Sequence, residues 1–134
     1  QIMKDVSIAI VTRDGKFLLL KRSDTDPSNP GRWALPGGHC DAGEDPIDGL
    51  LRELKEETSL ESKPIYCIKL HSMPHTKGRT LHFYWVTRSK NDVLIADGEH
   101  SEYIWCSANA SRMYNPLGET SKALKHIENE MKEI

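Results

Sequence analysis

The segment Gly38-His-Cys-Asp-Ala-Gly-Glu44 is followed, after a gap of seven residues, by Arg52-Glu-Leu-Lys-Glu-Glu-Thr-Ser-Leu60. Together they concentrate acidic side chains in one part of the chain. The first segment is predicted to be a loop, because residues 36–38 and 41–43 contain the proline, glycine and aspartate typical of turns. The second is predicted to be a helix, because Asp45 suits an N-cap and Pro46 suits the first helical position.

The predicted helix has an apolar stripe and an acidic sector. Its large aliphatic residues recur at i, i+3, i+4 and i+7, which places them on one core-facing side: Ile47, Leu50, Leu51 and Leu54. Glu53, Glu56 and Glu57 are expected to share the adjoining face, neither in the core nor fully in solvent. Gly49 indicates close packing against another backbone, since glycine inside a helix costs about 1 kcal/mol relative to alanine.

Placing three carboxylates together is unfavourable. Anions at i, i+3 and i+4 repel one another by about 0.2–0.5 kcal/mol per pair, and a helix C-terminus disfavours each anion by about 0.3–1 kcal/mol. A bound divalent cation would reverse both effects, and carboxylate oxygens suit Mg²⁺ or Mn²⁺. The alternative is a solvated acidic surface that binds nothing.

The complete pattern is Gly38-x5-Glu44-x7-Arg52-Glu53-Leu54-x-Glu56-Glu57-x-Ser59-Leu60. It resembles the signature of the Nudix hydrolases and differs only where Ser59 replaces the family's glycine. The resemblance implies an α/β fold, in which a mixed β-sheet lies between helices as an α/β/α sandwich, and one Nudix hydrolase domain spanning residues 1–134. Ser59 is expected to cost about 1 kcal/mol if the helix keeps a left-handed end there.

The resemblance also implies roles for individual residues. The expected catalytic residues are Glu53, Glu56, Glu57, Glu99 and Arg52. The expected metal ligands are Glu53, Glu56, Glu57 and Gly38, and the expected substrate-binding residues are Arg22, Gly37, Gly38 and Glu44. Glu44 and Arg52 are expected to pair and to hold Glu53 in position. Arg22 is preferred to Arg32 and Arg79 as a phosphate-binding arginine, because it stands at a predicted strand end.

The general base remains open at this stage. Glu99 precedes Trp105 with a spacing similar to that in MutT-type members, Glu102 is a competing choice, and a glutamate of the motif itself is a third. Glu99 and Glu102 would otherwise be ordinary exposed acids of a turn.

The implied activity is hydrolysis, dependent on Mg²⁺ or Mn²⁺, of a pyrophosphate bond in a nucleoside diphosphate derivative. A (d)NTP pyrophosphohydrolase of MutT type is favoured, although Asn115 is not a clean match for the purine-binding asparagine of those enzymes. One alternative is an ADP-ribose or nucleotide-sugar pyrophosphatase. The position of Pro74 after the motif weakly resembles that of a proline in the ADP-ribose hydrolases. The non-enzymatic alternatives are a nucleotide-sensing Nudix-fold module and an interaction domain that docks through its C-terminal helix.

Composition limits the other classes. The chain has 134 residues, which suits one domain, and its net charge of −2 disfavours a surface for polymeric nucleic acid. Cys40, Cys67 and Cys106 form no disulfide or zinc pattern, which favours a reducing cytoplasm. No membrane segment is expected, and the oligomeric state is expected to be a monomer or homodimer. A zinc site is not favoured, although its donors could be sought among the histidines at positions 39, 71, 75, 82 and 100.

Strands are predicted at residues 6–11, 17–21, 65–70, 81–87 and 102–106, and the first two should form a hairpin through Asp14-Gly15. Phe83-Tyr84-Trp85 would place at least one aromatic face in the core, although base stacking is an alternative. An amphipathic helix is predicted at residues 119–134. Packing against the core is favoured for it over a membrane surface or a partner.

Overall fold

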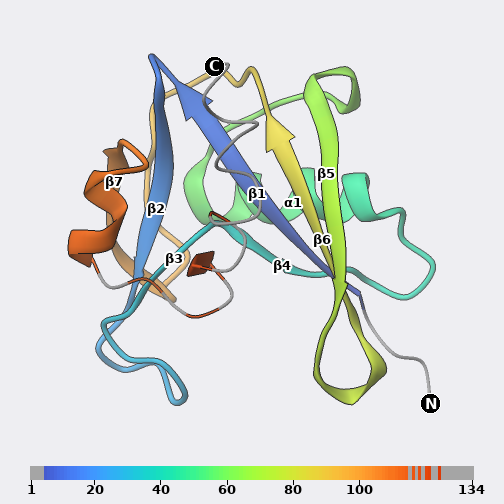
Figure 1. Cartoon of the computed structure of the whole chain (residues 1–134), viewed down its shortest axis with the longest axis horizontal. Coiled ribbons are helices and arrows are strands. Elements are labelled where there is room, and N and C mark those ends of the chain that lie inside the picture. Colours follow the sequence, from blue (N-terminus) through green and yellow to red (C-terminus); the bar gives the residue numbers. More distant parts are fainter. Residues whose placement is uncertain (1–4, 115, 117, 119, 122–123, 125–134) are drawn as a thin grey trace.

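The computed structural model describes residues 5–114, 116, 118, 120, 121 and 124. Its seven-stranded sheet has the order β3-β2-β1-β6-β5, with β4 also paired to β1 and β7 also paired to β2 (Figure 1). The strands are β1 (Val6–Arg13), β2 (Lys16–Arg22), β3 (Trp33–Ala34), β4 (Gly37–His39), β5 (Cys67–Pro74), β6 (Thr80–Val86) and β7 (His100–Cys106). The helical elements are α1 (Pro46–Thr58) and the short 3₁₀ turns η1 (Pro64–Tyr66), η2 (Thr76–Gly78) and η3 (Ala110–Tyr114).

The predicted hairpin forms between β1 and β2. Asp14 and Gly15 both have positive φ, 54° and 75°, as a two-residue turn with the twist of the adjoining strands requires. Thr12 lies opposite Phe17 in the antiparallel register. Local turn chemistry therefore accounts for this connection.

Strand β1 changes its partners along its length. Its first residues pair with β4, where Ser7 lies opposite Gly38, and its last residues pair with β2. On its other side it runs parallel to β6, with Ile8 opposite Phe83. Because other strands in the sheet are antiparallel, the sheet is mixed, and the expected α/β fold is confirmed.

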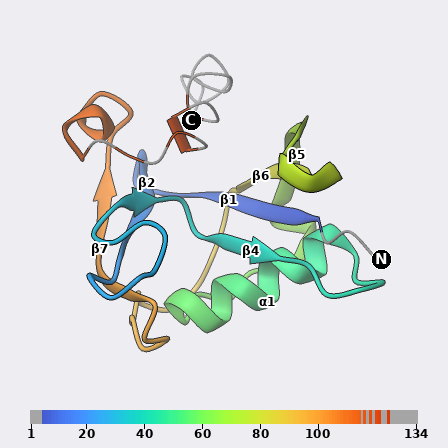
Figure 2. The ribbon, with the colours of Figure 1, turned by 90° about the horizontal axis from the view of Figure 1, so that it is seen from below.

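Alternation along the strands produces two cores, one on each face of the sheet. One contains Ile8, Ile10, Phe17, Leu19 and Phe83. The other contains Ala9, Val11, Leu18, Leu20 and Tyr84, together with Leu50, Leu54 and Leu60. Figure 2 shows α1 lying along one face of the sheet. Full burial of each large apolar side chain contributes about 1.5–3 kcal/mol to the free energy of unfolding. Leu50 and Leu54 therefore stabilise the packing of α1 against the sheet.

Several local predictions need correction. Residues 37–39 form β4 and not part of a loop, because β1 supplies backbone partners for them. Strand β5 begins at Cys67, since Ile65 lies in η1 with 81% of its surface exposed. Leu51 is only half-buried and is absent from the core that contains Leu50 and Leu54.

The aromatic run on β6 is a core feature. Phe83 and Tyr84 are buried on opposite faces of the sheet, and the Trp85 indole N–H donates to Thr12 Oγ1 at 2.8 Å. The base-stacking alternative therefore has no support from these side chains. Most of the predicted helix at residues 119–134 lies outside the described residues, as does Asn115; Leu124 packs, partly buried, against the first core.

Candidate active site

The two ends of α1 are fixed by local chemistry. Asp45 caps the N-terminus, accepting a hydrogen bond from the Ile47 N–H at 2.9 Å, and Pro46 follows as predicted. At the other end Ser59 has φ 66°, and its N–H donates to the Lys55 carbonyl oxygen at 2.9 Å. Ser59 therefore adopts the left-handed conformation expected of the family's glycine.

Glycines let β4 approach both β1 and α1 closely. The Gly37 N–H donates to Glu57 Oε1 at 2.9 Å. A Cβ at Gly37 would collide with the Ser7 carbonyl oxygen and lie 2.9 Å from the Ile8 Cα, whereas one at Gly38 would lie 2.6 Å from the Glu53 carboxyl carbon. Gly49 is tight for a similar reason, since its Cβ would lie 3.0 Å from the Cys40 Sγ. A side chain at position 38 would displace Glu53, whereas one at position 37 would push β4 away from β1.

Arg52 organises the acidic residues around it. It binds Glu44 through two hydrogen bonds of 3.1 Å, and it donates to the His39 carbonyl oxygen at 3.1 Å and to Glu53 Oε1 at 3.0 Å. The Arg52 hydrogen bond is the main reason that the pKa of Glu44 is lowered. Both partners of this pair therefore keep their charge, and Glu53 is held in one orientation.

The three glutamates of the motif occupy different environments. The side chain of Glu57 is 7% exposed, that of Glu53 is 20% exposed and that of Glu56 is 58% exposed. Glu56 lies 3.5 Å from Arg52 and does not line the cleft that contains the other two. The prediction of one shared, half-buried face is therefore wrong, because α1 turns Glu57 inward beneath β4 and leaves Glu56 in solvent.

A second group of side chains comes from the turn before β7. Asp97 Oδ1 accepts from the N–H groups of Glu99 and His100 at 3.0 and 3.1 Å, and Asp97 Oδ2 lies 2.7 Å from His100 Nδ1. His100 Nε2 lies 4.0 Å from Glu57 Oε2. The ligand atoms of Glu57, Asp97, Glu99 and His100 all lie within 4.8 Å of one another, which is close enough to hold a metal ion.

Glu99 and Glu102 are separated by their positions. Glu99 lines the cleft beside Glu53 and Glu57, whereas Glu102 pairs with Lys21 at 3.2 Å and is absent from the cleft. Sequence reasoning missed Asp97 and considered His100 only as a donor to a zinc site that was not favoured. The available signal was the Asp-Gly-Glu-His order, in which an aspartate beside a glycine favours a turn and returns hydrogen bonds to the next N–H groups.

Burial sets the electrostatics of this acidic cluster. It raises the pKa of Glu57 well above its usual value, although the Gly37 N–H opposes the shift, and nearby Glu53, Asp97 and Glu99 raise it further. Burial also raises the pKa of Glu53, against the effect of Arg52. Carboxylates crowded in this way are suited to a hard divalent cation, which their oxygens would bind in place of protons.

A cleft of about 720 Å³ opens over the acidic group. Arg22 and Arg79 both line it, whereas Arg32 is absent from its lining. Arg22 is bound to Asp26 at 3.1 Å, and Arg79 Nη1 lies 2.6 Å from His39 Nε2. Both arginines therefore stand where they could meet phosphate. Of the histidines in the described ranges, His100 alone belongs to a group of possible metal ligands, so the structure gathers no zinc set of histidines.

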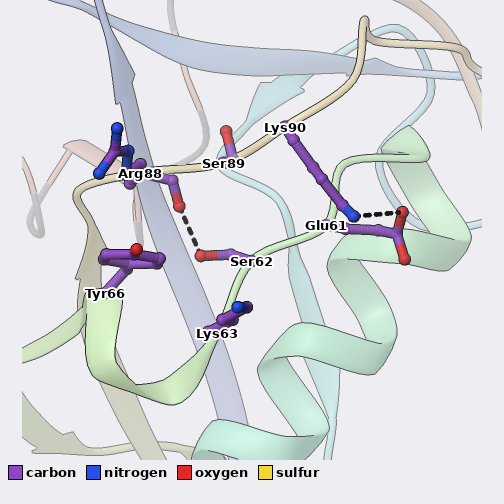
Figure 3. A pocket seen from close by; sticks show the side chains of 7 residues that line it. All are labelled: Glu61, Ser62, Lys63, Tyr66, Arg88, Ser89 and Lys90. Atoms are coloured by element: carbon purple, nitrogen blue, oxygen red, sulfur yellow. Dashed lines mark hydrogen bonds and ion pairs between the residues drawn. The ribbon is translucent and has the colours of Figure 1, made fainter.

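A separate pocket of about 380 Å³ lies beside Tyr66 (Figure 3). The Arg88 guanidinium is stacked 5.7 Å from the centre of the Tyr66 ring, and Lys90 lies 4.0 Å from Glu61. Ser62 donates to the Arg88 carbonyl oxygen, which joins the two walls. This pocket shares no lining residue with the acidic cleft and has one carboxylate among its lining side chains, so it lacks a comparable acidic cluster.

Comparison with known proteins identifies the family. The family model described as the NUDIX domain matches residues 3–126. The chain belongs to the Nudix family. It is therefore a hydrolase of the Nudix pyrophosphohydrolase class, and the resemblance seen in the motif is confirmed. Within the described residues, no helix is both long enough and apolar enough to span a membrane.

Named Nudix relatives act on different nucleotides. CTP pyrophosphohydrolase of Escherichia coli K12 is 32% identical over 113 residues, covering 84% of this chain and 82% of that protein. The asymmetrical bis(5'-nucleosyl)-tetraphosphatase of Mus musculus is 33% identical over 97 residues, covering 67% of this chain and 63% of that protein. The MutT protein of Methanosarcina mazei Go1 is 27% identical, with a TM-score of 0.75 and coverage of 99% and 98% of the two chains.

Proposed function

We propose that residues 1–134 form one Nudix domain that hydrolyses the pyrophosphate bond of a nucleoside triphosphate or deoxynucleoside triphosphate in the manner of MutT. The observation that carries this proposal is the convergence of Glu53, Glu57 and Glu99 in one cleft, beside the backbone of β4. A cleft of about 720 Å³ is within the range that binds small ligands. The similarity to a CTP pyrophosphohydrolase over most of both chains supports a triphosphate substrate.

The oxygen donors of the cleft fit Mg²⁺, with Mn²⁺ as a substitute. Glu53, Glu57 and the Gly38 backbone would hold the ion, and Glu56 would join them only by turning in from solvent. Such an ion, when bound, neutralises phosphate charge and brings water close to phosphorus. The charge on the acidic cluster supports this role, since it would otherwise repel an anionic substrate.

The protein's own groups would position the reactants. Arg52 and Glu44 hold Glu53 in place, as described above. Arg22 and Arg79, which both line the cleft, would contact phosphate oxygens. Glu99 is exposed in the cleft and is proposed to accept the proton of the attacking water, because it faces the same space as Glu53 and Glu57. Glu102 is not proposed for this role, because it is paired with Lys21.

A second substrate class has some support. An ADP-ribose pyrophosphatase of Methanocaldococcus jannaschii is 40% identical over 67 residues, although the match covers 48% of this chain and 37% of that protein. Two linked phosphates occur in both substrates, and the acidic cleft would bind either. The side chains that would read the base or the second sugar are not identified by this similarity, so the triphosphate is preferred on coverage.

The test is a substrate panel with the purified chain in Mg²⁺ and then Mn²⁺, with products identified by mass. The panel contains nucleoside triphosphates, ADP-ribose, nucleotide sugars and dinucleoside tetraphosphates, and the reaction in ¹⁸O-labelled water shows which phosphorus is attacked. We expect a nucleoside monophosphate and pyrophosphate from a triphosphate. Preference for ADP-ribose would instead establish the second class, and tight binding without any product would establish a nucleotide-sensing module.

Variants link the activity to the cleft. Glu53→Gln and Glu57→Gln are each expected to lower kcat by about 100-fold or more, since each removes a charge from the acidic cluster. Glu102→Gln is the matched control, because Glu102 lies outside the cleft on β7. Full activity in Glu57→Gln would contradict the proposed site.

A further inference from the structure

His100 faces Glu57 across a distance that no hydrogen bond spans. Their side chains are 6% and 7% exposed, and His100 Nε2 lies 4.0 Å from Glu57 Oε2. The other imidazole nitrogen, Nδ1, lies 2.7 Å from Asp97 Oδ2 and donates its proton there. Nε2 is therefore the ring nitrogen that faces the Glu57 carboxylate. Both residues line the cleft, so an ion that enters the cleft can reach these two atoms.

The orientation of His100 is fixed by its own loop. Asp97 accepts the N–H groups of Glu99 and His100, and Gly98 makes the turn with φ 76°. Arg22 pairs with His100 at the start of β7, which anchors the backbone to β2. An imidazole that donates to a carboxylate from one nitrogen is the usual arrangement of a histidine metal ligand. Asp97 is therefore a positioning residue for His100.

We propose that His100 Nε2 binds the divalent ion of the cleft together with Glu57, so that a bound Mn²⁺ has a nitrogen ligand as well as oxygen ligands. The proposal rests on the proposed metal-dependent function. Two ligand atoms each about 2.1 Å from one ion lie at most about 4.2 Å apart, so the observed 4.0 Å lies within the reach of a single ion. Imidazole nitrogen suits transition metals, whereas Mg²⁺ prefers oxygen donors alone.

The alternative is that His100 only pairs with Glu57 to support the fold. In both possibilities His100 lies beside Glu57, but they differ in which atoms bind the metal. Under the alternative, a bound Mn²⁺ has oxygen ligands alone. Direct detection of a nitrogen ligand therefore separates them without any measurement of catalysis.

The experiment uses the whole chain without nucleotide and with one equivalent of Mn²⁺. Pulsed electron paramagnetic resonance detects modulation from a directly bound ¹⁴N nucleus, and the signal of free Mn²⁺ gives the Kd. We expect nitrogen modulation in the wild type and its loss in His100→Gln, with Mn²⁺ binding about 10–100-fold weaker. Asp97→Asn is expected to weaken Mn²⁺ binding about 10-fold, because it no longer orients the imidazole.

His82→Gln is the control, since His82 also contacts an aspartate, Asp5, but lies on β6 outside the metal-ligand group. It should retain the nitrogen signal. Mn²⁺ bound without nitrogen modulation in the wild type would overturn the proposal, even if His100→Gln failed to fold, and so would absence of Mn²⁺ binding. If the nucleotide panel is hydrolysed but no nitrogen signal is seen, the assignment of His100 as a ligand is wrong and the proposed activity stands. If a nitrogen signal is seen without hydrolysis, the proposed activity is wrong and the ligand assignment stands.

Discussion

Glu57 is the residue at which the fold and the acidic site meet. It belongs to the buried face of α1, yet its neighbours include the carboxyl groups of Glu53, Asp97 and Glu99. One of its oxygens is held by the Gly37 N–H, and the other faces His100. A buried carboxyl group with these neighbours is unfavourable when it is ionised and no cation is bound.

The pH dependence of stability follows from this burial. In chelator-treated protein the folded-state pKa of Glu57 lies above its unfolded value, so the folded state binds more protons between the two values. The free energy of unfolding should fall as the pH rises through that window, by at most about 1.4 kcal/mol per pH unit for this group. Glu57→Gln should reduce the slope in urea unfolding between pH 5 and pH 8. Equal slopes for the variant and the wild type would contradict it, and Glu102→Gln should keep the wild-type slope.

At the scale of elements, α1 and β4 are joined by the hydrogen bond from the Gly37 N–H to Glu57. The capped start of α1 is predictable from Asp45 and Pro46, because the cap is a local interaction. Strand β4 is not predictable in the same way, because residues 37–39 contain two glycines and become a strand only through pairing with β1. The close approach of β4 then brings a backbone N–H to Glu57.

Ser59 carries a measurable cost at the end of α1. Its φ of 66° is unfavourable for a residue with a Cβ. We expect Ser59→Gly to raise the free energy of unfolding by about 1 kcal/mol, measured by urea denaturation. Ser59→Ala is the matched comparison, because both variants lose the 3.4 Å contact between Ser59 Oγ and the Leu94 carbonyl oxygen, but alanine keeps the backbone strain. Equal stability of the two variants would show that the conformation of residue 59 costs nothing.

At the scale of the whole molecule, the partner change along β1 creates the cleft. Strand β4 and α1 lie on one side of it, and β2 with the turn before β7 lies on the other. Glu57 and His100 are thereby contributed from opposite sides. An ion bound by both would tie the two sides together.

Metal binding should therefore stabilise the fold. A metal present at 100 times its Kd is expected to raise the free energy of unfolding by about 2.7 kcal/mol. Thermal unfolding of chelator-treated chain, with Mn²⁺ or Mg²⁺ added back, measures the effect as a rise in Tm. Glu57→Gln should lose most of the rise and Glu102→Gln should keep it. A rise of the same size in both variants would mean that the ion acts elsewhere.

The sequence was sufficient for the family, the extent of α1, the first hairpin and the pairing of Glu44 with Arg52. Each of these depends on residues close together in the chain or on a motif of fixed spacing. The contrast between buried Glu57 and exposed Glu56, the strand at residues 37–39 and the place of His100 beside Glu57 emerged only from the folded chain. They depend on contacts between segments about 20 to 40 residues apart, whose geometry is set by the packing of α1 and the turn before β7 around β1.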